Sequence, residues 1–120
     1  MRKRGLQPSE AEIQKAILQF LGYVQDAFFW RNNTGAVKIV RNNGKKGFVK
    51  FGLKGSPDII GCYKGNFVAF EVKSAKGIAS LEQKDFLNRI KKCGGYSFIV
   101  RSVDDVVNAM EKIKIDYEKR

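Results

Sequence analysis

The sequence contains no histidine, and among its 120 residues it has only two cysteines and two prolines. The absence of histidine excludes catalytic schemes that use an imidazole, including the Ser-His-Asp triad, and it excludes histidine metal ligands. Cys62 and Cys93 lie in separate apolar segments without a CxxC spacing, so they cannot form a zinc site by themselves. We interpret both as small core residues of a protein in a reducing compartment.

Long apolar runs are also absent. No stretch approaches the roughly 18 apolar residues that a membrane span requires. The basic residues from Met1 to Arg4 are not followed by the apolar segment of a secretory signal. These features predict a cytoplasmic protein without a membrane partner.

Positive charge, in contrast to histidine, cysteine and proline, is abundant in the chain. The chain has 23 basic and 12 acidic residues, a formal net charge of +11. A balance this basic favours a polyanionic partner, because neutralising phosphates releases condensed counterions. The simpler alternative is that the charge only keeps a small protein soluble. The basic residues also cluster between 31 and 55, which favours nucleic acid.

The length predicts a single domain over residues 1–120, with a flexible basic tail at 1–7. Helices are predicted to begin after Ser9, Ser80 and Ser102, and residues 115–120 are expected to fray. The resulting order is α-β-β-β-β-β-α-β-α, and the strand-helix-strand segment 67–100 indicates a crossover in a mixed sheet. The strands are predicted at 27–31, 37–40, 48–51, 58–63, 67–73 and 96–100.

Hydrophobic spacing assigns the expected core. The first helix should bury one stripe, and the last helix should turn another inward. Aromatic residues do not form an evident base-stacking platform, so we interpret them as core. The two stripes are Ile13, Ile17, Phe20, Leu21 and Val24, and Val106, Val107, Met110 and Ile113; the aromatic residues are Phe28, Phe29, Trp30, Phe67, Phe70 and Phe98.

The most informative motif is an aspartate at the start of one apolar strand and an acid-x-lysine at the end of the next. Asp58 follows Gly55-Ser56-Pro57, and Glu71-Val72-Lys73 comes thirteen residues later. Side chains alternate across a strand, so Glu71 and Lys73 share a face. A turn at Lys64-Gly65 would place Asp58 opposite Glu71, and a turn at 65–66 would place it opposite Lys73. Both alternatives put the three groups on one face, roughly 4.5–8 Å apart.

This arrangement suits a divalent cation and a phosphodiester. Two carboxylates at that separation can bind one Mg²⁺ or Mn²⁺ through oxygen ligands, and the Val72 carbonyl is a plausible further ligand. Lys73 can offset developing charge or orient the attacking water. The alternative is a cross-strand ion pair on a solvated face, worth less than about 1 kcal/mol. The apolar sequence around these charges favours a site over that alternative.

The basic segment 31–55 is interpreted as an excursion from the core that faces DNA. Its basic side chains would contact phosphates without reading sequence, and its asparagines would add backbone hydrogen bonds. The alternative is a solvated hairpin without a ligand. The predicted DNA-binding residues are Arg31, Asn33, Lys38, Arg41, Lys45, Lys46, Lys50 and Lys54.

At these motifs the chain resembles the PD-(D/E)XK nuclease superfamily, with Pro57-Asp58 and Glu71-Val72-Lys73 as the two halves. It resembles more closely the VRR-NUC family, in particular its small standalone phage and viral forms. The similarity runs from Ser9 to about Val107. It includes Ser9-Glu10 before a helix, the segment 30–35 (WRNNTG), Phe51-Gly52 ahead of 55–58, Ser80-Leu81-Glu82-Gln83, Cys93-Gly94-Gly95 and Val100-Arg101-Ser102.

The resemblance implies a restriction-endonuclease-like α/β core and a Mg²⁺- or Mn²⁺-dependent endonuclease that recognises branched DNA as a homodimer. It implies that Asp58 and Glu71 bind the metal, that Lys73 assists catalysis, that Glu10 completes the site and that Gln83 is catalytic. Glu10 lies on the inward stripe of its helix, whereas Glu12, the alternative, is rotated off it. Gln83 is also the fourth residue of a capping box, Ser80-x-x-Gln83, which explains it without catalysis.

The sequence therefore predicts a metal-dependent, structure-selective DNA endonuclease, with a Holliday junction resolvase as the leading interpretation. No organic cofactor is expected. One alternative is a monomeric flap or nicking nuclease. Another is a basic DNA-binding module in which the carboxylates are structural.

Overall fold

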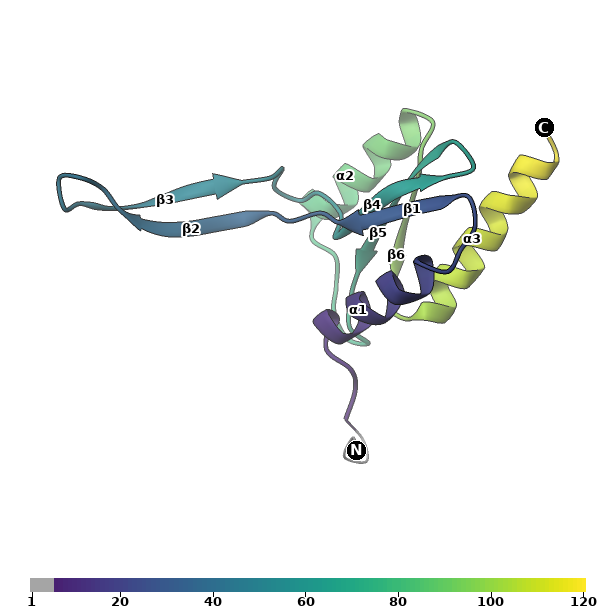
Figure 1. The fold of residues 1–120 in the computed structure, drawn as a ribbon, viewed down its shortest axis with the longest axis horizontal. Helices are drawn as coiled ribbons and strands as arrows, with labels where there is room; N and C mark the ends of the chain where they lie inside the picture. The colour runs from purple at the N-terminus through teal and green to yellow at the C-terminus, as the bar shows by residue number, and fades with distance from the viewer. Residues whose placement is uncertain (1–5) are drawn as a thin grey trace.

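The computed structural model describes residues 6–120, which form three helices and six strands in the predicted order (Figure 1). The predicted tail at 1–7 falls largely outside these residues. Leu6 and Gln7 belong to no helix or strand. The elements are α1 (Glu10–Leu21), β1 (Ala27–Arg31), β2 (Gly35–Val40), β3 (Lys46–Phe51), β4 (Ile59–Tyr63), β5 (Asn66–Val72), α2 (Leu81–Lys92), β6 (Tyr96–Val100) and α3 (Val103–Glu118).

Four strands form the central sheet in the order β1-β4-β5-β6. The β1/β4 and β4/β5 pairs are antiparallel, and β5/β6 is parallel. Helix α2 connects the two parallel strands, as a crossover requires. The predicted α/β fold with a mixed sheet and flanking helices is therefore confirmed.

The turn between β4 and β5 decides the register of the motif strands. Tyr63 pairs with Asn66, so Lys64 and Gly65 form the two-residue turn. Both turn residues have positive φ, 50° and 82°, as expected for a type I′ hairpin. This register places Asp58, one residue before β4, opposite Glu71 on β5. Of the two predicted turns, the structure therefore has the one at 64–65.

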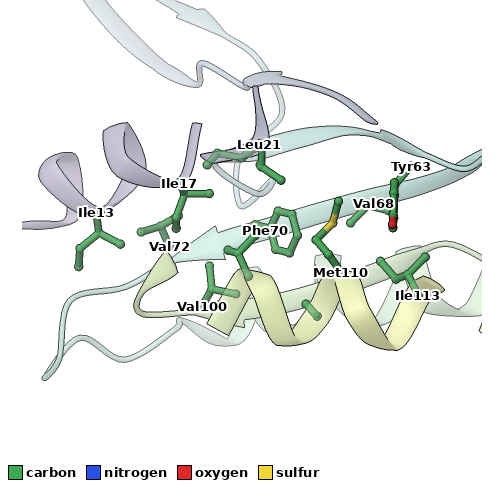
Figure 2. Close-up of a cluster of buried hydrophobic side chains, with 13 residues drawn as sticks. Ile13, Ile17, Leu21, Tyr63, Val68, Phe70, Val72, Val100, Met110 and Ile113 are labelled. Atoms are coloured by element: carbon green, nitrogen blue, oxygen red, sulfur yellow. The ribbon is translucent and has the colours of Figure 1, made fainter. Parts of the chain in front are cut away.

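Helices cover the sheet on both faces. The α1 and α3 helices pack on the face that contains Val68, Phe70 and Val72, and their apolar side chains interleave with these strand residues (Figure 2). Helix α2 packs on the opposite face, where the Ser97 hydroxyl donates a hydrogen bond to the Leu87 carbonyl at 2.8 Å. We call this second side the α2 face. It carries the residues at 58, 60, 62, 67, 69, 71, 97 and 99.

The sequence of α1 explains both its start and its buried stripe. The Ser9 side chain accepts a hydrogen bond from the Glu12 amide, and Glu12 returns one to the Ser9 amide. This capping box satisfies two amides at the helix start. Ile13, Ile17 and Leu21 are buried, while Phe20 and Val24 pack partly against the same core, as predicted.

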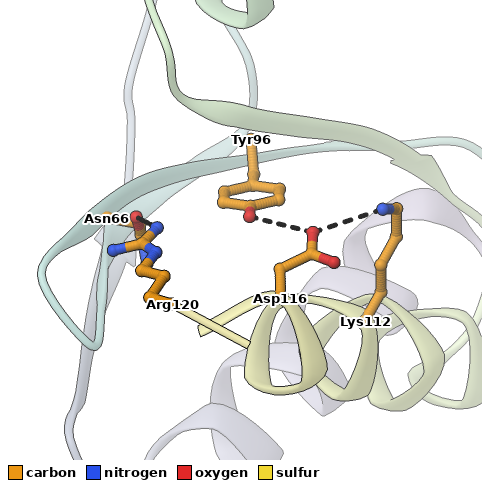
Figure 3. A network of polar contacts seen from close by, with 5 residues as sticks. All are labelled: Asn66, Tyr96, Lys112, Asp116 and Arg120. Carbon is orange, nitrogen blue, oxygen red and sulfur yellow. Dashed lines mark hydrogen bonds and ion pairs between the residues drawn. The ribbon is translucent and has the colours of Figure 1, made fainter. Parts of the chain in front are cut away.

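Helix α3 is longer and rotated slightly from the prediction. It continues to Glu118 instead of fraying after residue 114. The Tyr96 hydroxyl donates to Asp116 at 3.0 Å, Lys112 also contacts Asp116, and Arg120 donates to Asn66 at 2.8 Å (Figure 3). The contacts to Tyr96 and Asn66 tie the end of the helix to the rest of the fold and stabilise its last turns.

The predicted inward stripe of α3 was wrong at one position. Val107 is exposed, and Ala109 is buried in its place beside Val106 and Met110. The helix packs against the sheet through Val106, Ala109, Met110 and Ile113. Its buried face is therefore rotated away from Val107.

Strands β2 and β3 form a separate two-stranded hairpin, which we call the arm. It extends away from the rest of the molecule (Figure 1), and the radius of gyration is 16.8 Å, whereas a compact chain of this length has about 14 Å. Its strands are longer than the predicted ones, 35–40 and 46–51 instead of 37–40 and 48–51. Within the segment 31–55, residues 35–51 form this arm, whereas Arg31 still belongs to β1 of the central sheet.

Several predicted core residues are exposed. Phe28, Trp30 and Phe67 lie on the surface, whereas Phe29, Phe70 and Phe98 pack in or against the core. Cys62 and Cys93 are exposed free thiols, which corrects their assignment as buried residues. For Phe28, Trp30 and Cys62 the reason is that α2 contacts β6 and leaves the β1 and β4 side of the α2 face uncovered. No helix within residues 6–120 has both the length and the apolar character of a membrane span.

Candidate active site

Asp58 and Glu71 meet on the α2 face, at the end of the sheet from which the arm departs. They lie opposite each other where the β4/β5 register is extended by one residue, and Asp58 raises the pKa of Glu71 through a hydrogen bond and through its charge. Glu71 is 2% exposed, and Asp58 is partly buried. Two neighbouring carboxylates repel each other, and this repulsion favours the protonated form of the buried Glu71.

Asp58 is held by contacts that the sequence did not predict. Its Oδ2 accepts a hydrogen bond from the Val72 amide at 2.7 Å, and its carbonyl accepts one from the Asn32 amide at 2.7 Å. The Asn32 side chain donates to Ser56 Oγ at 2.7 Å and to the Pro57 carbonyl at 2.9 Å. Asn32 therefore ties the turn before Asp58 to the end of β1. No local pattern at Asn32 could reveal this role, because its partners are 24 and 25 residues away.

Glu71 has an unusual environment. Burial raises its pKa from 4.5 to about 9, and the hydrogen bond and charge of Asp58 act in the same direction. Lys73 lowers this pKa, and Glu10 raises it further. Within residues 6–120, Glu71 Oε1 is the buried side-chain oxygen that lacks a hydrogen-bond partner. A buried oxygen without a partner is costly in a purely structural role.

Lys73 and Glu10 lie near this pair. Lys73 extends the β5 ladder, since its amide donates to the Val100 carbonyl at 3.0 Å, and the residue is buried. Both residues act on Glu71 electrostatically. Glu10 Oε2 lies beside Gly77 in the loop after β5. It is 3.3 Å from the position that a Cβ on Gly77 would occupy. The first helix thus brings an acid to the edge of the site.

Gln83 and Glu12 both serve as helix caps. The side-chain oxygen of Gln83 accepts a hydrogen bond from the backbone N–H of Ser80 at 2.9 Å. In return, Ser80 Oγ accepts one from the backbone N–H of Gln83 at 3.1 Å. The capping box predicted at 80–83 is confirmed. A catalytic role for Gln83 remains a prediction. Because the side-chain oxygen is used in the cap, such a role would have to use the side-chain NH₂ group. Glu12 is exposed and takes part in the cap of α1, in agreement with its outward phase.

The side-chain donors of the site fit a hard divalent cation. The carboxyl groups of Asp58 and Glu71, including the unpartnered Oε1 of Glu71, offer only oxygen ligands, which Mg²⁺ and Mn²⁺ prefer. The Val72 amide points at Asp58, and in an extended strand the carbonyl of the same residue points to the same side. Within residues 6–120, no three acidic or cysteine side chains are close enough to bind an ion together. Water would therefore supply several ligands, as is usual for Mg²⁺.

Arg101 fixes the loop that follows Lys73, and sequence reasoning missed this function. Its Nη1 donates to the Ser74 carbonyl at 2.6 Å and to the Gly77 carbonyl at 2.7 Å. The same loop contacts Glu10. Arg101 lies at the end of β6, beside the end of β5 in the parallel pair, so only the tertiary fold brings it to the loop.

The predicted DNA-binding residues are all exposed but fall into three places. Lys38, Lys46 and Lys50 lie on the strands of the arm, and Arg41 and Lys45 lie at its tip. Arg31 and Asn33 lie at its base, close to Asp58, while Lys54 turns toward α2 and forms an exposed ion pair with Glu82 at 3.8 Å. Neither a family model nor a curated protein matches the sequence.

Proposed function

We propose that this protein is a divalent-metal-dependent DNA endonuclease of the VRR-NUC type, acting on branched DNA as a homodimer. The observation that carries the proposal is the Asp58–Glu71 pair, in which Glu71 is buried and has an unpartnered oxygen, next to Lys73. A structural ion pair would satisfy its buried atoms. This pair retains an unsatisfied acceptor and a raised pKa, and such perturbed acidic groups cluster at functional sites.

Two neighbouring features support a nucleic-acid substrate. The chain has a net charge of +11, and the arm that starts beside Asp58 carries five basic residues between 38 and 50. A phosphodiester backbone that lies along the arm would reach the acidic pair at its base. The contacts would be with phosphates, so selectivity would come from DNA shape and not from base sequence.

The roles of the residues follow from their environments. Asp58 and Glu71 would hold the cation, with the Val72 carbonyl as a further ligand. A bound divalent cation would neutralise charge on the phosphoryl oxygens and lower the pKa of a water molecule. Lys73 would hold its ammonium against the phosphate and orient the attacking water. Asn32 and Arg101 would keep the two loops of the site in place.

Incubation with a labelled four-way DNA junction and Mg²⁺ tests the proposal. A junction-resolving homodimer should introduce paired nicks at symmetric positions, because a twofold axis presents two sites to two strands. EDTA should abolish cleavage but not binding. Linear duplex of the same sequence serves as the control substrate and should be cut far more slowly.

The same assay distinguishes the alternatives. Single unpaired nicks, or preferential cleavage of a flap, would indicate a monomeric nuclease. Binding without cleavage in Mg²⁺ and in Mn²⁺ would contradict an enzymatic function and favour a DNA-binding module.

The arm should provide much of the affinity for DNA. Replacement of Lys45 and Lys46 by alanine should lower the slope of log K against log salt by about 1.8, because each phosphate contact contributes about 0.9. Fluorescence anisotropy between 50 and 200 mM NaCl measures the slope. Lys114→Ala with Lys119→Ala, on α3 and at its C-cap, removes the same charge and should change the slope little. An equal change in both variants would exclude a specific role for the arm.

A further inference from the structure

The arm carries positive charge without negative charge to balance it. No acidic residue occurs between Asp26 and Asp58, and the arm contributes five basic residues, between positions 38 and 50, to this segment. Basic side chains without acidic neighbours attract a polyanion, and binding to a nucleic acid gains further from the counterions that its phosphates release. The charge of the arm therefore favours a phosphate backbone over a second copy of the same basic arm.

The register of β2 and β3 divides the side chains of the arm between two faces, because partners in an antiparallel pair project to the same side. Lys38 pairs with Phe48, and the neighbouring pairs on this side contain Lys46 and Lys50. We call this side the lysine face, defined by Ala36, Lys38, Val40, Lys46, Phe48 and Lys50. The opposite face has no lysine and carries Val37, Ile39, Val49 and Phe51, with Arg41 lying over Gly47 at its distal end.

Phe48 lies at the centre of the lysine face and is 61% exposed. Lys38 is directly opposite it across the ribbon, with about 5 Å between the Cβ atoms. Lys46 and Lys50 lie about 7 Å away on either side of it along β3. An exposed aromatic ring among lysines can make the two contacts that an unstacked nucleotide offers, because the ring stacks on the base and the lysines bind phosphates.

We propose that Phe48 stacks on a base at the branch point of the DNA and thereby selects branched over continuous DNA. This inference rests on the nuclease of the proposed function and names the residue by which it recognises its substrate. The lysines at 38, 46 and 50 would contact the phosphates on either side of the stacked base. Because every base has an aromatic face, the contact would be independent of base sequence.

The structure of DNA explains why such a ring would discriminate between substrates. In a continuous duplex each base face is covered by its neighbours, so an inserted ring must first separate two stacked base pairs. That separation costs about as much as the new stacking returns. At a branch point a base pair can lose one stacking neighbour without breaking its own hydrogen bonds. The ring therefore adds affinity at a branch and little on linear duplex, whereas the lysines contribute to both.

Phe48 would select the substrate without touching the reacting phosphate. It lies three residues before the end of β3, which is about 10 Å along the strand from the base of the arm. The chain then continues through residues 52–57 to Asp58. The stacked base would thus lie several nucleotides from the phosphodiester at the acidic pair. Phe48 is accordingly a specificity-determining residue and not a catalytic one.

Binding in EDTA to a four-way junction and to a linear duplex of the same sequence tests the inference by fluorescence anisotropy. The ends of both DNAs are blocked with biotin and streptavidin, so that terminal bases are not available for stacking. Phe48→Ala should weaken junction binding by roughly 5- to 150-fold, the range for the loss of one stacked base, and duplex binding by less than about threefold. Phe48→Trp should keep the wild-type preference. Val49→Ala, the neighbouring change on the opposite face, should alter neither affinity.

The salt dependence of junction binding separates the loss of stacking from the loss of the arm. A Phe48→Ala protein with an intact arm keeps its lysine contacts, so the slope of log K against log salt should equal that of wild type. A slope that falls as in the Lys45 and Lys46 double variant would show that the substitution disrupts the arm. A fluorescent reporter at the same position then decides the question, because it keeps an aromatic ring there.

The reporter is Phe48→Trp in a Trp30→Phe background, which leaves a single indole in the protein. Its fluorescence should be quenched by the blocked junction and not by the blocked duplex, since stacking on a base quenches an indole. Val49→Trp in the same background should respond to neither DNA.

Three results would overturn the inference. The first is equal weakening of junction and duplex binding by Phe48→Ala with an unchanged salt slope. The second is a change in the reporter fluorescence when the protein concentration is raised without DNA, which would make a second copy the occupant of the lysine face. The third is a response of the reporter to phosphatidylserine vesicles and not to the junction, which would make a lipid surface the occupant.

The inference and the proposed function can fail separately. Wild-type junction preference in Phe48→Ala, together with cleavage in Mg²⁺, would exclude the stacking contact and retain the nuclease. Junction binding that depends on Phe48, without cleavage in Mg²⁺ or in Mn²⁺, would retain the recognition of the branch point and exclude the nuclease.

Discussion

Asp58→Asn is expected to reduce DNA cleavage by at least about 10³-fold while junction binding stays within about threefold of wild type. The change removes one of the two negative charges that would hold the cation, a loss of about 4 kcal/mol of transition-state stabilisation. The asparagine oxygen can still accept the hydrogen bond from the Val72 amide, so the fold of the turn should persist.

Single-turnover cleavage of a four-way junction measures the first effect, and fluorescence anisotropy in Ca²⁺ or EDTA measures the second. Asp104→Asn, at the exposed start of α3, makes the same charge change away from the site and should cut normally. Cleavage by Asp58→Asn at more than a tenth of the wild-type rate would show that the site has been wrongly assigned.

Glu71 should make metal binding depend strongly on pH. Its raised pKa of about 9 means that the metal-free protein holds a proton there at neutral pH, which an incoming cation must displace. The apparent affinity for Mn²⁺ should therefore rise by up to about tenfold per pH unit between pH 6 and 8, and level off near pH 9. Titration calorimetry in two buffers of different ionisation enthalpy should detect about one proton released per ion.

The same proton affects stability with a definite sign. The folded-state pKa of about 9 lies above the ordinary value of 4.5, so the folded protein holds one more proton than the unfolded chain between these values. The free energy of unfolding should then fall as pH rises through that window, by at most about 1.4 kcal/mol per unit. Urea unfolding in EDTA measures the slope.

Glu71→Gln is the decisive variant for this effect. Glutamine is neutral at every pH, so the variant should unfold with a flatter pH dependence and should not bind Mn²⁺ with proton release. Glu111→Gln, on the exposed side of α3, removes a surface carboxylate and should keep the wild-type slope. Identical slopes for wild type and Glu71→Gln would show that Glu71 is ionised in the folded protein.

The placement of the acidic pair was accessible from the sequence because strand geometry is local. Side-chain alternation put Asp58, Glu71 and Lys73 on one face whichever two-residue turn was used. The turn itself was ambiguous, since Lys64-Gly65 and Gly65-Asn66 are both acceptable. The type I′ geometry at Lys64 and Gly65 resolved it.

Exposure was less predictable than secondary structure. Phe28, Trp30, Phe67 and the two cysteines were expected in the core because apolar residues usually are. Which face of a strand is covered depends on where helices dock, and α2 covers only the β6 side of its face. The end of α3 was similarly misjudged, because Asp116 is held by Tyr96 from a different strand.

The sequence by itself determined the order of elements, the helix caps at Ser9 and Ser80, the basic excursion and the side of the sheet on which the acids lie. These depend on periodicity and on residues a few positions apart. Only the tertiary structure decided that Glu71 is buried with an unpartnered oxygen, that Asn32 and Arg101 hold the loops of the site, and that the arm leaves apolar side chains exposed on both of its faces. Burial and long-range hydrogen bonds arise from segments that are distant in the chain, and no local pattern contains them.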